Sequence, residues 1–347
     1  MRRAAVLGAG YMGSSITFPL AENGIAVNLW GTWFDDDIID SCRKGHHPRL
    51  KKRLPEDVNL YGSENLEAAL RDVDAVWIAV SSGGFLPVFS RAVELISGET
   101  VFFALTKGLI PDNGRVKRQS EIAEELFEKE FPGKRFLWIS IGGPVKAVEL
   151  SDRIPSASVY GISDPELRRM AGLVSTDCYR VFCTTDVVGV ELSASFKNVY
   201  AMAVGMCDGI YGGDRKGGYH NLSSLLFTQG VKEMSVIVAR AGGKNDTAFG
   251  LAGVGDLYVT ARSGRNRRCG EMIGRGIEPR EAYAAMLKEG EIAEGYPALE
   301  QGVEWIRRLD PGLMNRLPLL ECLHRIVFQG QDPADCLKGL TKILPLF

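Results

Sequence analysis

The sequence predicts an α/β fold in which an N-terminal domain, built on a doubly wound parallel sheet, is followed by a mostly α-helical C-terminal domain. In the first half of the chain, short apolar runs alternate with amphipathic segments, and a glycine-rich turn follows the first run. From about residue 186 onward, long segments with helical spacing replace this alternation. Strands that alternate with helices are typical of parallel sheets. We therefore expect two domains, at residues 1–186 and 187–347.

Five apolar runs in the first half predict strands that are buried on both faces, because each is nearly continuous in Val, Ile, Leu, Phe and Trp. In chain order they read "RRAAVLG", "IAVNLWG", "AVWIAVS", "TVFFALT" and "RFLWISIGG". Helices are predicted among them at residues 11–23, 65–71 and 119–131. Two further short strands, "SASVYGI" and "YRVFCTT", are predicted on either side of a helix at residues 164–173.

The second domain is predicted to consist of helices, because its segments have helical spacing and few β-branched runs. The expected helices cover residues 187–207, 223–241, 267–274, 279–289, 298–308 and 317–329. A glycine-rich, charged loop, "CDGIYGGDRKGGYHN", interrupts the first two of them. Such a loop is hard to predict.

The composition indicates a soluble globular protein that acts on small molecules. With 347 residues, 45% of them hydrophobic and 24% charged, the chain is long and apolar enough for two packed domains. Its formal net charge of −2 gives no large basic field, so nucleic acid is not expected as a partner. Apolar runs of about 18 residues, which a membrane span requires, are missing from the sequence.

The N-terminus and the cysteines favour a cytoplasmic location. The start, "MRRAAVLGAGYMG", is too short and too broken by glycines for a signal peptide. The seven cysteines are an odd number, scattered, and include no C-x-x-C pair. This pattern predicts neither a disulfide framework nor a zinc site, and no metal is expected.

The stretch "GAGYMG" predicts a dinucleotide-binding loop of the Rossmann type. Its glycines, Gly8, Gly10 and Gly13, fit G-x-G-x-x-G, and the motif follows a buried strand and opens a helix. The amides of Tyr11 and Met12 would face the phosphates at the positive end of that helix. The alternative is a glycine-rich turn without a ligand.

The second strand bears on the choice between NAD and NADP. NAD-selective sites place a carboxylate at the end of this strand, about 20 residues after the glycines. Here Gly31 and Thr32 occupy that place, and the first acid, Asp35, follows slightly later. Thr32 could donate to a 2′-phosphate, which favours NADP over NAD. A site that accepts both cofactors, or one in which Asp35 reaches round, stays open.

Two polar stretches in the second domain are candidates for chemistry. Lys197 and Asn198 stand in an otherwise apolar helix, "LSASFKNVYAMAVGMC", flanked by small residues that leave room for a ligand. The alternative is a lysine whose stem covers apolar surface. In "GVGDLYVTARSGRNRRCG", Arg265 beside Asn266 suits a phosphate or carboxylate, and the alternative is a solvated basic loop.

Six stretches together resemble the NAD(P)-dependent glycerol-3-phosphate dehydrogenase family, in order and over nearly the whole chain. They are "GAGYMG", "TKGLI", "GGPVKAVEL", "ELSASFKNVYAMAVG", "GVGDLYVTARSGRNR" and "AEGYPALE". The resemblance implies a Rossmann domain followed by a helical domain. It also implies interconversion of dihydroxyacetone phosphate and sn-glycerol 3-phosphate, a phosphorylated small-molecule substrate and a homodimer.

The resemblance also assigns residues to roles. It implies that Lys197 is the proton donor and acceptor, that Lys107 contacts substrate and cofactor, and that Asp256 orients Lys197. The positions that it implies for substrate binding are Lys107, Gly143, Val145, Asn198, Thr260, Arg265 and Asn266. Those that it implies for cofactor binding are Gly8, Gly10, Tyr11, Met12, Gly13, Thr32, Lys107, Ala147, Arg265, Ile292 and Glu294.

Lysine suits this chemistry because hydride transfer to a carbonyl leaves an alkoxide that needs a proton and a nearby positive charge. A free lysine has a pKa of about 10.4, and desolvation or a like charge lowers it. We expect the apolar helix to desolvate Lys197, and Lys107 to supply the like charge if both reach one pocket.

Two departures from the family pattern leave room for a different substrate. Val145 stands where many members have Ser or Thr, and residues 208–221 form a longer and more charged loop than usual. A larger phosphorylated polyol or ketose is therefore an alternative substrate. An enzyme similar to the 6-phosphogluconate or β-hydroxyacid dehydrogenases also stays open, as does a non-catalytic nucleotide-binding regulator.

Overall fold

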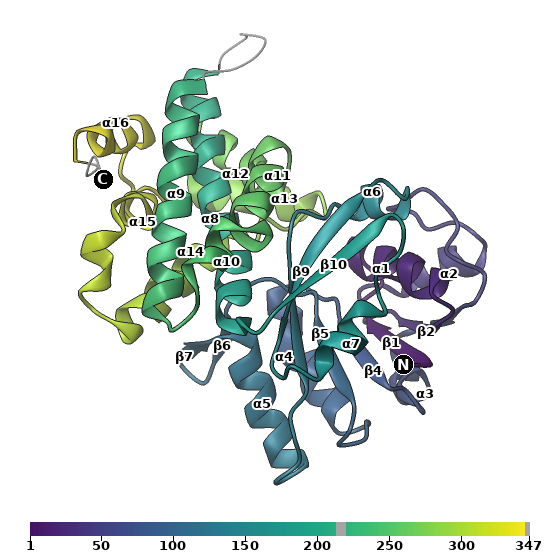
Figure 1. The fold of residues 1–347 in the computed structure, drawn as a ribbon. Coiled ribbons are helices and arrows are strands. Elements are labelled where there is room, and N and C mark those ends of the chain that lie inside the picture. The colour runs from purple at the N-terminus through teal and green to yellow at the C-terminus, as the bar shows by residue number, and fades with distance from the viewer. Residues whose placement is uncertain (213–219, 344–347) are drawn as a thin grey trace. The chain divides into compact units, whose positions relative to one another are not determined.

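The computed structural model describes residues 1–212 and 220–343, and the chain forms two compact units (Figure 1). One unit, here called the N-terminal unit, contains Met1–Ile110 and Arg118–Glu191. The other, the C-terminal unit, contains Pro111–Lys117 and Leu192–Phe347. The predicted loop at residues 208–221 falls largely outside the described residues.

An eight-stranded sheet forms the centre of the N-terminal unit, in the order β3-β2-β1-β4-β5-β8-β9-β10. From β1 the chain moves outward to one side through β2 and β3 and then to the other side through β4 and β5, as doubly wound sheets do. The strands are β1 (Arg3–Leu7), β2 (Ala26–Trp30), β3 (Val58–Tyr61), β4 (Ala75–Ile78), β5 (Val101–Ala104), β8 (Trp138–Gly142), β9 (Ser156–Ile162) and β10 (Tyr179–Thr184). All seven predicted strands are confirmed, and β3 is additional.

The doubly wound, mostly parallel sheet agrees with the prediction, and its last two strands run in the opposite direction to the rest. β9 pairs antiparallel with β8, and β10 pairs parallel with β9, so both run against the other six. The connection between β8 and β9 contains only α6 (Ala147–Ser151). Five helical residues span about 7.5 Å, whereas a five-residue strand spans about 16 Å. This helix is too short to return the chain to the start of β8, so β9 begins near the end of β8.

Helices cover both faces of the sheet, which explains why its central strands β1, β4, β5 and β8 are mostly apolar. One core cluster joins Ile16 and Leu20 of α1 to one face, and another joins Phe85 and Phe89 of α4 to the other face. The helices of this unit besides α6 are α1 (Tyr11–Glu22), α2 (Asp36–Arg43), α3 (Leu66–Leu70), α4 (Ser82–Val93), α5 (Gln119–Glu130) and α7 (Leu167–Gly172).

The C-terminal unit is mostly helical, as predicted. Its first helix, α8 (Val187–Tyr211), begins in the N-terminal unit. The others are α9 (His220–Arg240), α10 (Asn245–Phe249), α11 (Asp256–Arg262), α12 (Arg265–Gly274), α13 (Pro279–Lys288), α14 (Gly295–Leu309), α15 (Pro318–Gln329) and α16 (Pro333–Ile343). The six predicted helices are confirmed, with ends that move by a few residues. Two strands, β6 (Ile110–Asp112) and β7 (Arg115–Lys117), pair as a small hairpin, most of which belongs to this unit.

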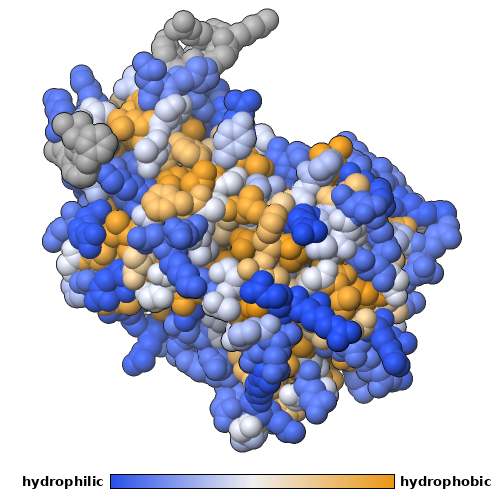
Figure 2. Space-filling view, in the orientation of Figure 1, coloured by the Kyte–Doolittle hydropathy of each residue, from blue (hydrophilic) through white to orange (hydrophobic). Residues whose placement is uncertain are grey.

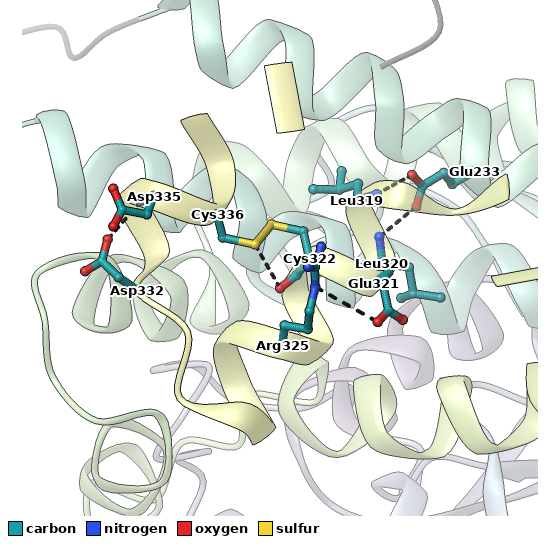
Figure 3. Close-up of a disulfide and its surroundings, with 9 residues drawn as sticks. All are labelled: Glu233, Leu319, Leu320, Glu321, Cys322, Arg325, Asp332, Asp335 and Cys336. Carbon is teal, nitrogen blue, oxygen red and sulfur yellow. Dashed lines mark hydrogen bonds and ion pairs between the residues drawn. A yellow bond between two sulfur atoms is a disulfide. The ribbon is translucent and has the colours of Figure 1, made fainter. Parts of the chain in front are cut away.

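A buried carboxylate caps α15 from a neighbouring helix. Glu233 of α9 accepts hydrogen bonds from the amides of Leu319 (2.6 Å) and Leu320 (2.9 Å), as Figure 3 shows. These amides lie in the first turn of α15, where backbone N–H groups lack partners within the helix. Burial raises the pKa of Glu233 to about 7. The cap fixes the start of α15 against α9.

A cysteine pair corrects the expectation drawn from the cysteine pattern. Cys322 of α15 and Cys336 of α16 form a disulfide, with Cα atoms 6.1 Å apart (Figure 3). Gly330 ends α15 in the left-handed conformation, with φ of 70°, and the chain then folds back into α16. This turn brings together two cysteines whose separation of 14 residues matches no recognised motif.

Hydrophilic side chains cover much of the face shown in Figure 2, with apolar side chains between them. Two exposed large apolar residues, Trp33 and Phe34, come shortly after β2. Of the helices in the described ranges, none is long and apolar enough to cross a membrane.

Candidate functional site

The glycine loop has the geometry that a dinucleotide requires. A Cβ atom on Gly8, whose φ is 113°, would lie 2.8 Å from the carbonyl oxygen of Ala79. A Cβ atom on Gly13 would lie 1.9 Å from the carbonyl oxygen of Gly8. Only glycine therefore fits at either position. Gly10 begins α1 without a side-chain cap, so the amides of the first turn are available for an anion.

A carboxylate lies at the end of β2, and it belongs to the segment that follows the strand. Asp35 Oδ2 accepts hydrogen bonds from Thr32 Oγ1 (2.8 Å), Thr32 N (3.1 Å) and Ala9 N (3.3 Å). Both Asp35 and Thr32 are buried. Asp35 thus contacts the glycine loop, and the alternative in which it reaches a ribose hydroxyl stays a prediction. The hydroxyl of Thr32 donates to this carboxylate.

Four other predicted residues lie at or beyond the carboxyl ends of β5 and β8, in the N-terminal unit. Lys107 Nζ lies 3.5 Å from the carbonyl oxygen of Gly143, and the amide of Val145 donates to the same oxygen at 2.9 Å. Ala147 starts α6, and its carbonyl oxygen accepts a hydrogen bond from Ser15 of α1 at 2.7 Å. The contact fixes α6 against the helix that carries the glycine loop.

Lys197 contacts polar side chains of the C-terminal unit. Its Nζ atom donates to Asp256 Oδ1 at 2.9 Å and to Thr260 Oγ1 at 2.8 Å. Lys197 is 6% exposed and Asp256 is 3% exposed, so the ion pair lies out of contact with bulk water. The hydroxyl of Thr260 in turn donates to the carbonyl oxygen of Asp256 at 2.7 Å. Lys197 is therefore held in one orientation and does not extend to the surface.

A π-helical turn places Asp256. Residues Leu251–Gly255, "LAGVG", form this turn directly before α11. A Cβ atom on Gly253 would lie 1.9 Å from the carbonyl oxygen of Ala248, so the turn requires glycine there. π-helical turns are rare and are frequent at functional sites. The sequence did not predict this turn, because its two glycines and its small or β-branched residues are typical of a loop.

Asn198 has a partner that the sequence did not identify. Asn266 Nδ2 donates to Asn198 Oδ1 at 2.7 Å, and the amide of Gly295 donates to Asn266 Oδ1 at 2.8 Å. These contacts join α8, α12 and α14 next to Lys197. Ile292 and Glu294 belong to the segment that ends at Gly295 and leads into α14.

Arg265 is the first residue of α12, two residues before the predicted start of this helix. Its side chain is exposed and forms no ion pair with any residue that the structure describes. Gly264 precedes it without a side-chain cap, so the first amides of α12 and the guanidinium are both available to an anion.

Glycines bring α8 and α12 into close contact. A Cβ atom on Gly205 of α8 would lie 2.0 Å from the carbonyl oxygen of Arg267, and one on Gly270 of α12 would lie 2.1 Å from that of Met202. Gly209 and Gly274 repeat these contacts one turn later. The two backbones pack directly against each other, which sets the distance between Asn198 and Asn266.

Comparisons with known proteins agree with this geometry. Residues 3–168 match the family model described as NAD-dependent glycerol-3-phosphate dehydrogenase N-terminus, and residues 186–338 match the corresponding C-terminus. The NADP(+)-dependent glycerol-3-phosphate dehydrogenase of Archaeoglobus fulgidus is 33% identical over 340 residues, which cover 97% of this chain and 98% of that protein. The chain belongs to the NAD(P)-dependent glycerol-3-phosphate dehydrogenase family.

Other members are similar over the same length. A glycerol-3-phosphate dehydrogenase [NAD(P)+] of Thermus thermophilus is 33% identical over 341 residues, 97% of each chain. The crystal structure of glycerol-3-phosphate dehydrogenase from Coxiella burnetii has 30% sequence identity and a TM-score of 0.81, and it covers 98% of this chain and 99% of its own. As a member of the glycerol-3-phosphate dehydrogenase family, the chain is an oxidoreductase that acts on a CH–OH group and uses NAD or NADP.

Glu191 is a buried residue of this dehydrogenase that sequence reasoning missed. It lies in the first turns of α8 and accepts hydrogen bonds from Arg118 Nη1 (3.1 Å), Ser120 Oγ (2.8 Å) and Ser140 Oγ (2.9 Å). Burial raises the pKa of Glu191, and the Arg118 guanidinium opposes this rise. The network ties the start of α8 to α5 and β8. The sequence feature that could have identified Glu191 is an acidic residue within the apolar start of a predicted helix.

One cavity of about 310 Å³ lies elsewhere in the N-terminal unit, and none of the predicted site residues lines it. It is bordered by Phe18, Glu22, Asp57 and Arg153, among others. The Arg153 guanidinium is paired there with the Glu22 carboxylate at 2.6 Å.

Proposed function

We propose that the chain interconverts dihydroxyacetone phosphate and sn-glycerol 3-phosphate, with Lys197 as the proton relay. The observation that carries this proposal is the buried Lys197, held by Asp256 and Thr260. A buried ammonium is costly unless it is paired. The fixed orientation suits a group that donates a proton at one defined point.

The N-terminal unit supports the dinucleotide part of the proposal. Gly8 and Gly13 fit only as glycines, and the uncapped first turn of α1 offers amides to a pyrophosphate. Asp35, which follows the end of β2, would accept a hydrogen bond from a ribose hydroxyl. The nicotinamide cofactor supplies or accepts the hydride when it is bound. We infer that this unit, close to residues 1–186, binds the dinucleotide.

The C-terminal unit supports the substrate part. Lys197 Nζ would give a proton to the carbonyl oxygen of the ketone, and its charge would stabilise the developing alkoxide. In the reverse direction, the same atom would take the hydroxyl proton. Asp256 orients the ammonium through the 2.9 Å contact.

Substrate phosphate has a suitable binding group at the start of α12. Arg265 presents an exposed guanidinium, and a guanidinium binds two phosphate oxygens at once. The side chain of Asn266 is engaged with Asn198 and Gly295, which leaves its backbone amide for an anion. Anchoring the phosphate would fix the carbonyl in place, an orientation effect worth several kcal/mol of barrier.

An assay of NADH and NADPH oxidation tests the proposal. We expect turnover with dihydroxyacetone phosphate, and slower turnover with four- and five-carbon phosphoketoses. A larger phosphoketose as the better substrate would overturn the proposed specificity and leave the lysine relay intact. Cofactor binding without turnover of any phosphoketose would identify a nucleotide-binding regulator instead.

The homodimer and the cytoplasmic location also remain proposals. The family resemblance supports the first. Multi-angle light scattering of the purified protein at about 76 kDa, twice the chain mass of 37.9 kDa, would agree with a homodimer.

A further inference from the structure

The disulfide between Cys322 and Cys336 joins α15 to α16 in the C-terminal unit, and no proposed role includes it. Both cysteines are buried, with exposed fractions of 1% and 4% (Figure 3). The other five cysteines of the chain are free, and they are Cys42, Cys178, Cys183, Cys207 and Cys269. The pair is therefore one defined place at which thiol chemistry can change how two helices are joined.

The helix α16 depends on its neighbours for stability. It has 11 residues, and helices shorter than about 12–15 residues are marginal in water on their own. Its buried side chains include Cys336, Leu337 and Leu340, which are at most 4% exposed. The two cysteines are separated by 14 residues in the chain, and a disulfide that closes a loop of this length removes many conformations that a released helix could adopt. The bond therefore favours the attached state of α16.

The attachment of α16 also matters for α12. The two helices are in contact, and α12 begins at Arg265 and holds Asn266 against Asn198 of α8 at 2.7 Å. α12 thus has α8 and α16 among its neighbours within the C-terminal unit. Its position therefore depends in part on whether α16 is in place.

The surroundings of the pair favour a thiolate at Cys336. Arg325 follows Cys322 by three residues on α15, so the two side chains share a face of the helix (Figure 3). In the reduced pair, a hydrogen bond from the Cys322 thiol lowers the pKa of Cys336, and the Arg325 guanidinium acts in the same direction, although burial and the Glu321 carboxylate oppose the shift. A thiolate is the form that attacks a disulfide sulfur. Cys336 is therefore the sulfur that starts the formation of the bond.

The reaction at this pair is thiol–disulfide exchange with a small dithiol or disulfide. A dithiol reductant attacks one sulfur as a thiolate and releases the other, which takes up a proton. The second thiol of the reductant then displaces the first cysteine, so the protein gains two electrons and two protons and the reductant becomes a disulfide. In the reverse direction, the Cys336 thiolate attacks a small disulfide, and Cys322 closes the bond with release of two thiols in total. Because both sulfurs are buried, α16 has to open locally before a reagent reaches them.

We propose that Cys322 and Cys336 form a reversible redox switch, in which the disulfide holds α16 against α15 and α12 and reduction releases it. The oxidised protein keeps α12 in the position that the structure shows, and it therefore binds the phosphorylated substrate more tightly. In the reduced protein α16 opens more often, α12 loses a neighbour, and substrate affinity falls. The effect on the substrate rests on the proposed function, whereas the release of α16 does not.

Mass spectrometry of the natural protein tests the switch. Peptide analysis should detect the link between Cys322 and Cys336 after treatment with glutathione disulfide, and two alkylated thiols after treatment with dithiothreitol. Hydrogen exchange of the α16 amides should be about 10- to 100-fold faster in the reduced protein, because the loop is no longer closed. The amides of α5, in the N-terminal unit, should exchange at the same rate in both states. KM for dihydroxyacetone phosphate should rise about 2- to 30-fold on reduction, the range of a modest coupling between sites.

Two serine variants are matched controls for these measurements. Cys336→Ser cannot form the bond, so its α16 amides should exchange at the rate of the reduced natural protein under both conditions. Cys183→Ser in β10 removes a free cysteine and should keep the full difference between the oxidised and reduced states. A difference that persists in Cys336→Ser would belong to another thiol and would overturn the proposal.

The remaining outcomes separate the switch from the proposed function. Failure to form the link with glutathione disulfide, or equal exchange of α16 in the two states, would overturn the switch. Faster exchange of α16 with an unchanged KM would overturn its connection to α12. Lack of turnover in both states would count against the proposed function alone, because hydrogen exchange reports on α16 without any substrate.

Discussion

At the scale of single residues, the site depends on a few buried polar groups that have polar partners. Lys197 pairs with Asp256, Asn198 with Asn266, and His47 with Ser14. When one member of a buried polar pair is removed, the remaining member is left without a hydrogen-bond partner. This lowers the free energy of unfolding by about 1–3 kcal/mol, and by more when the remaining group is charged. Single substitutions at these positions should therefore have large and separable effects.

Asp256→Asn tests how Lys197 is oriented. The amide keeps the shape of the carboxylate but removes the charge that holds the ammonium, so kcat should fall by about 100-fold, a typical contribution of a positioned proton-transfer group. Cofactor affinity should stay the same, because the glycine loop belongs to the other unit. Steady-state kinetics and cofactor titration measure the two effects. The exposed Asp246→Asn on α10 is the control, and equal kcat in both variants would contradict this role.

His47 should make stability depend on pH. Burial lowers the pKa of His47 below its usual 6.5. As pH falls below about 6.5, the unfolded chain binds a proton at this position and the folded chain does not, so stability falls with pH. Urea unfolding at pH 5.5 and 7.5 should show a smaller difference for His47→Asn than for the natural protein. An unchanged difference would show that His47 does not titrate on unfolding.

At the scale of elements, close helix packing places the site residues. α8 and α12 meet through Gly205 and Gly270, whose lack of a side chain allows backbone contact. The first turn of α12 then holds Asn266 against Asn198. The sequence predicted both helices but not their contact, because a glycine within a helix gives no sign of its neighbour. The same limit applies to the π-helical turn before Asp256.

Gly270→Ala should force α8 and α12 apart, because the new Cβ atom would lie 2.1 Å from the carbonyl oxygen of Met202. We expect a loss of about 1–3 kcal/mol in the free energy of unfolding. KM for the phosphorylated substrate should also rise, since Asn266 moves with α12. Gly339→Ala in α16 is the control: open space surrounds it, so helix propensity should stabilise the protein by up to about 1 kcal/mol. Equal stability of the two variants would exclude close packing.

Prediction of elements succeeded where burial leaves a pattern in the sequence. Five strands (β1, β2, β4, β5 and β8) were visible because they are mostly apolar, since both faces of the sheet are covered. α4 was missed because Gly83, Gly84 and Pro87 resemble a loop, although Phe85 and Phe89 pack it firmly on the sheet. The antiparallel direction of β9 depends on the length of a connection, which composition does not reveal.

At the scale of the whole molecule, the sequence predicted candidate site residues but not which residues they contact. The ordered motifs of the family resemblance pointed to Lys197, Asp256, Arg265 and the glycine loop, and their roles stay predictions. The contacts of Asp35 with Ala9 and of Asn198 with Asn266 join positions far apart in the chain. Such contacts become visible only in the folded structure, as does the pair of Cys322 with Cys336.

The most direct test of the account is the rate of NADPH oxidation with dihydroxyacetone phosphate in Lys197→Met. Methionine retains much of the apolar length of the lysine side chain and removes the transferable proton. The exposed Lys232→Met on α9 is the control, and cofactor titration confirms that each variant is folded. We predict that kcat falls at least about 1,000-fold in Lys197→Met, within the range for a general acid, while cofactor affinity is unchanged. A kcat near that of the natural protein would contradict the assignment of Lys197 as the proton relay.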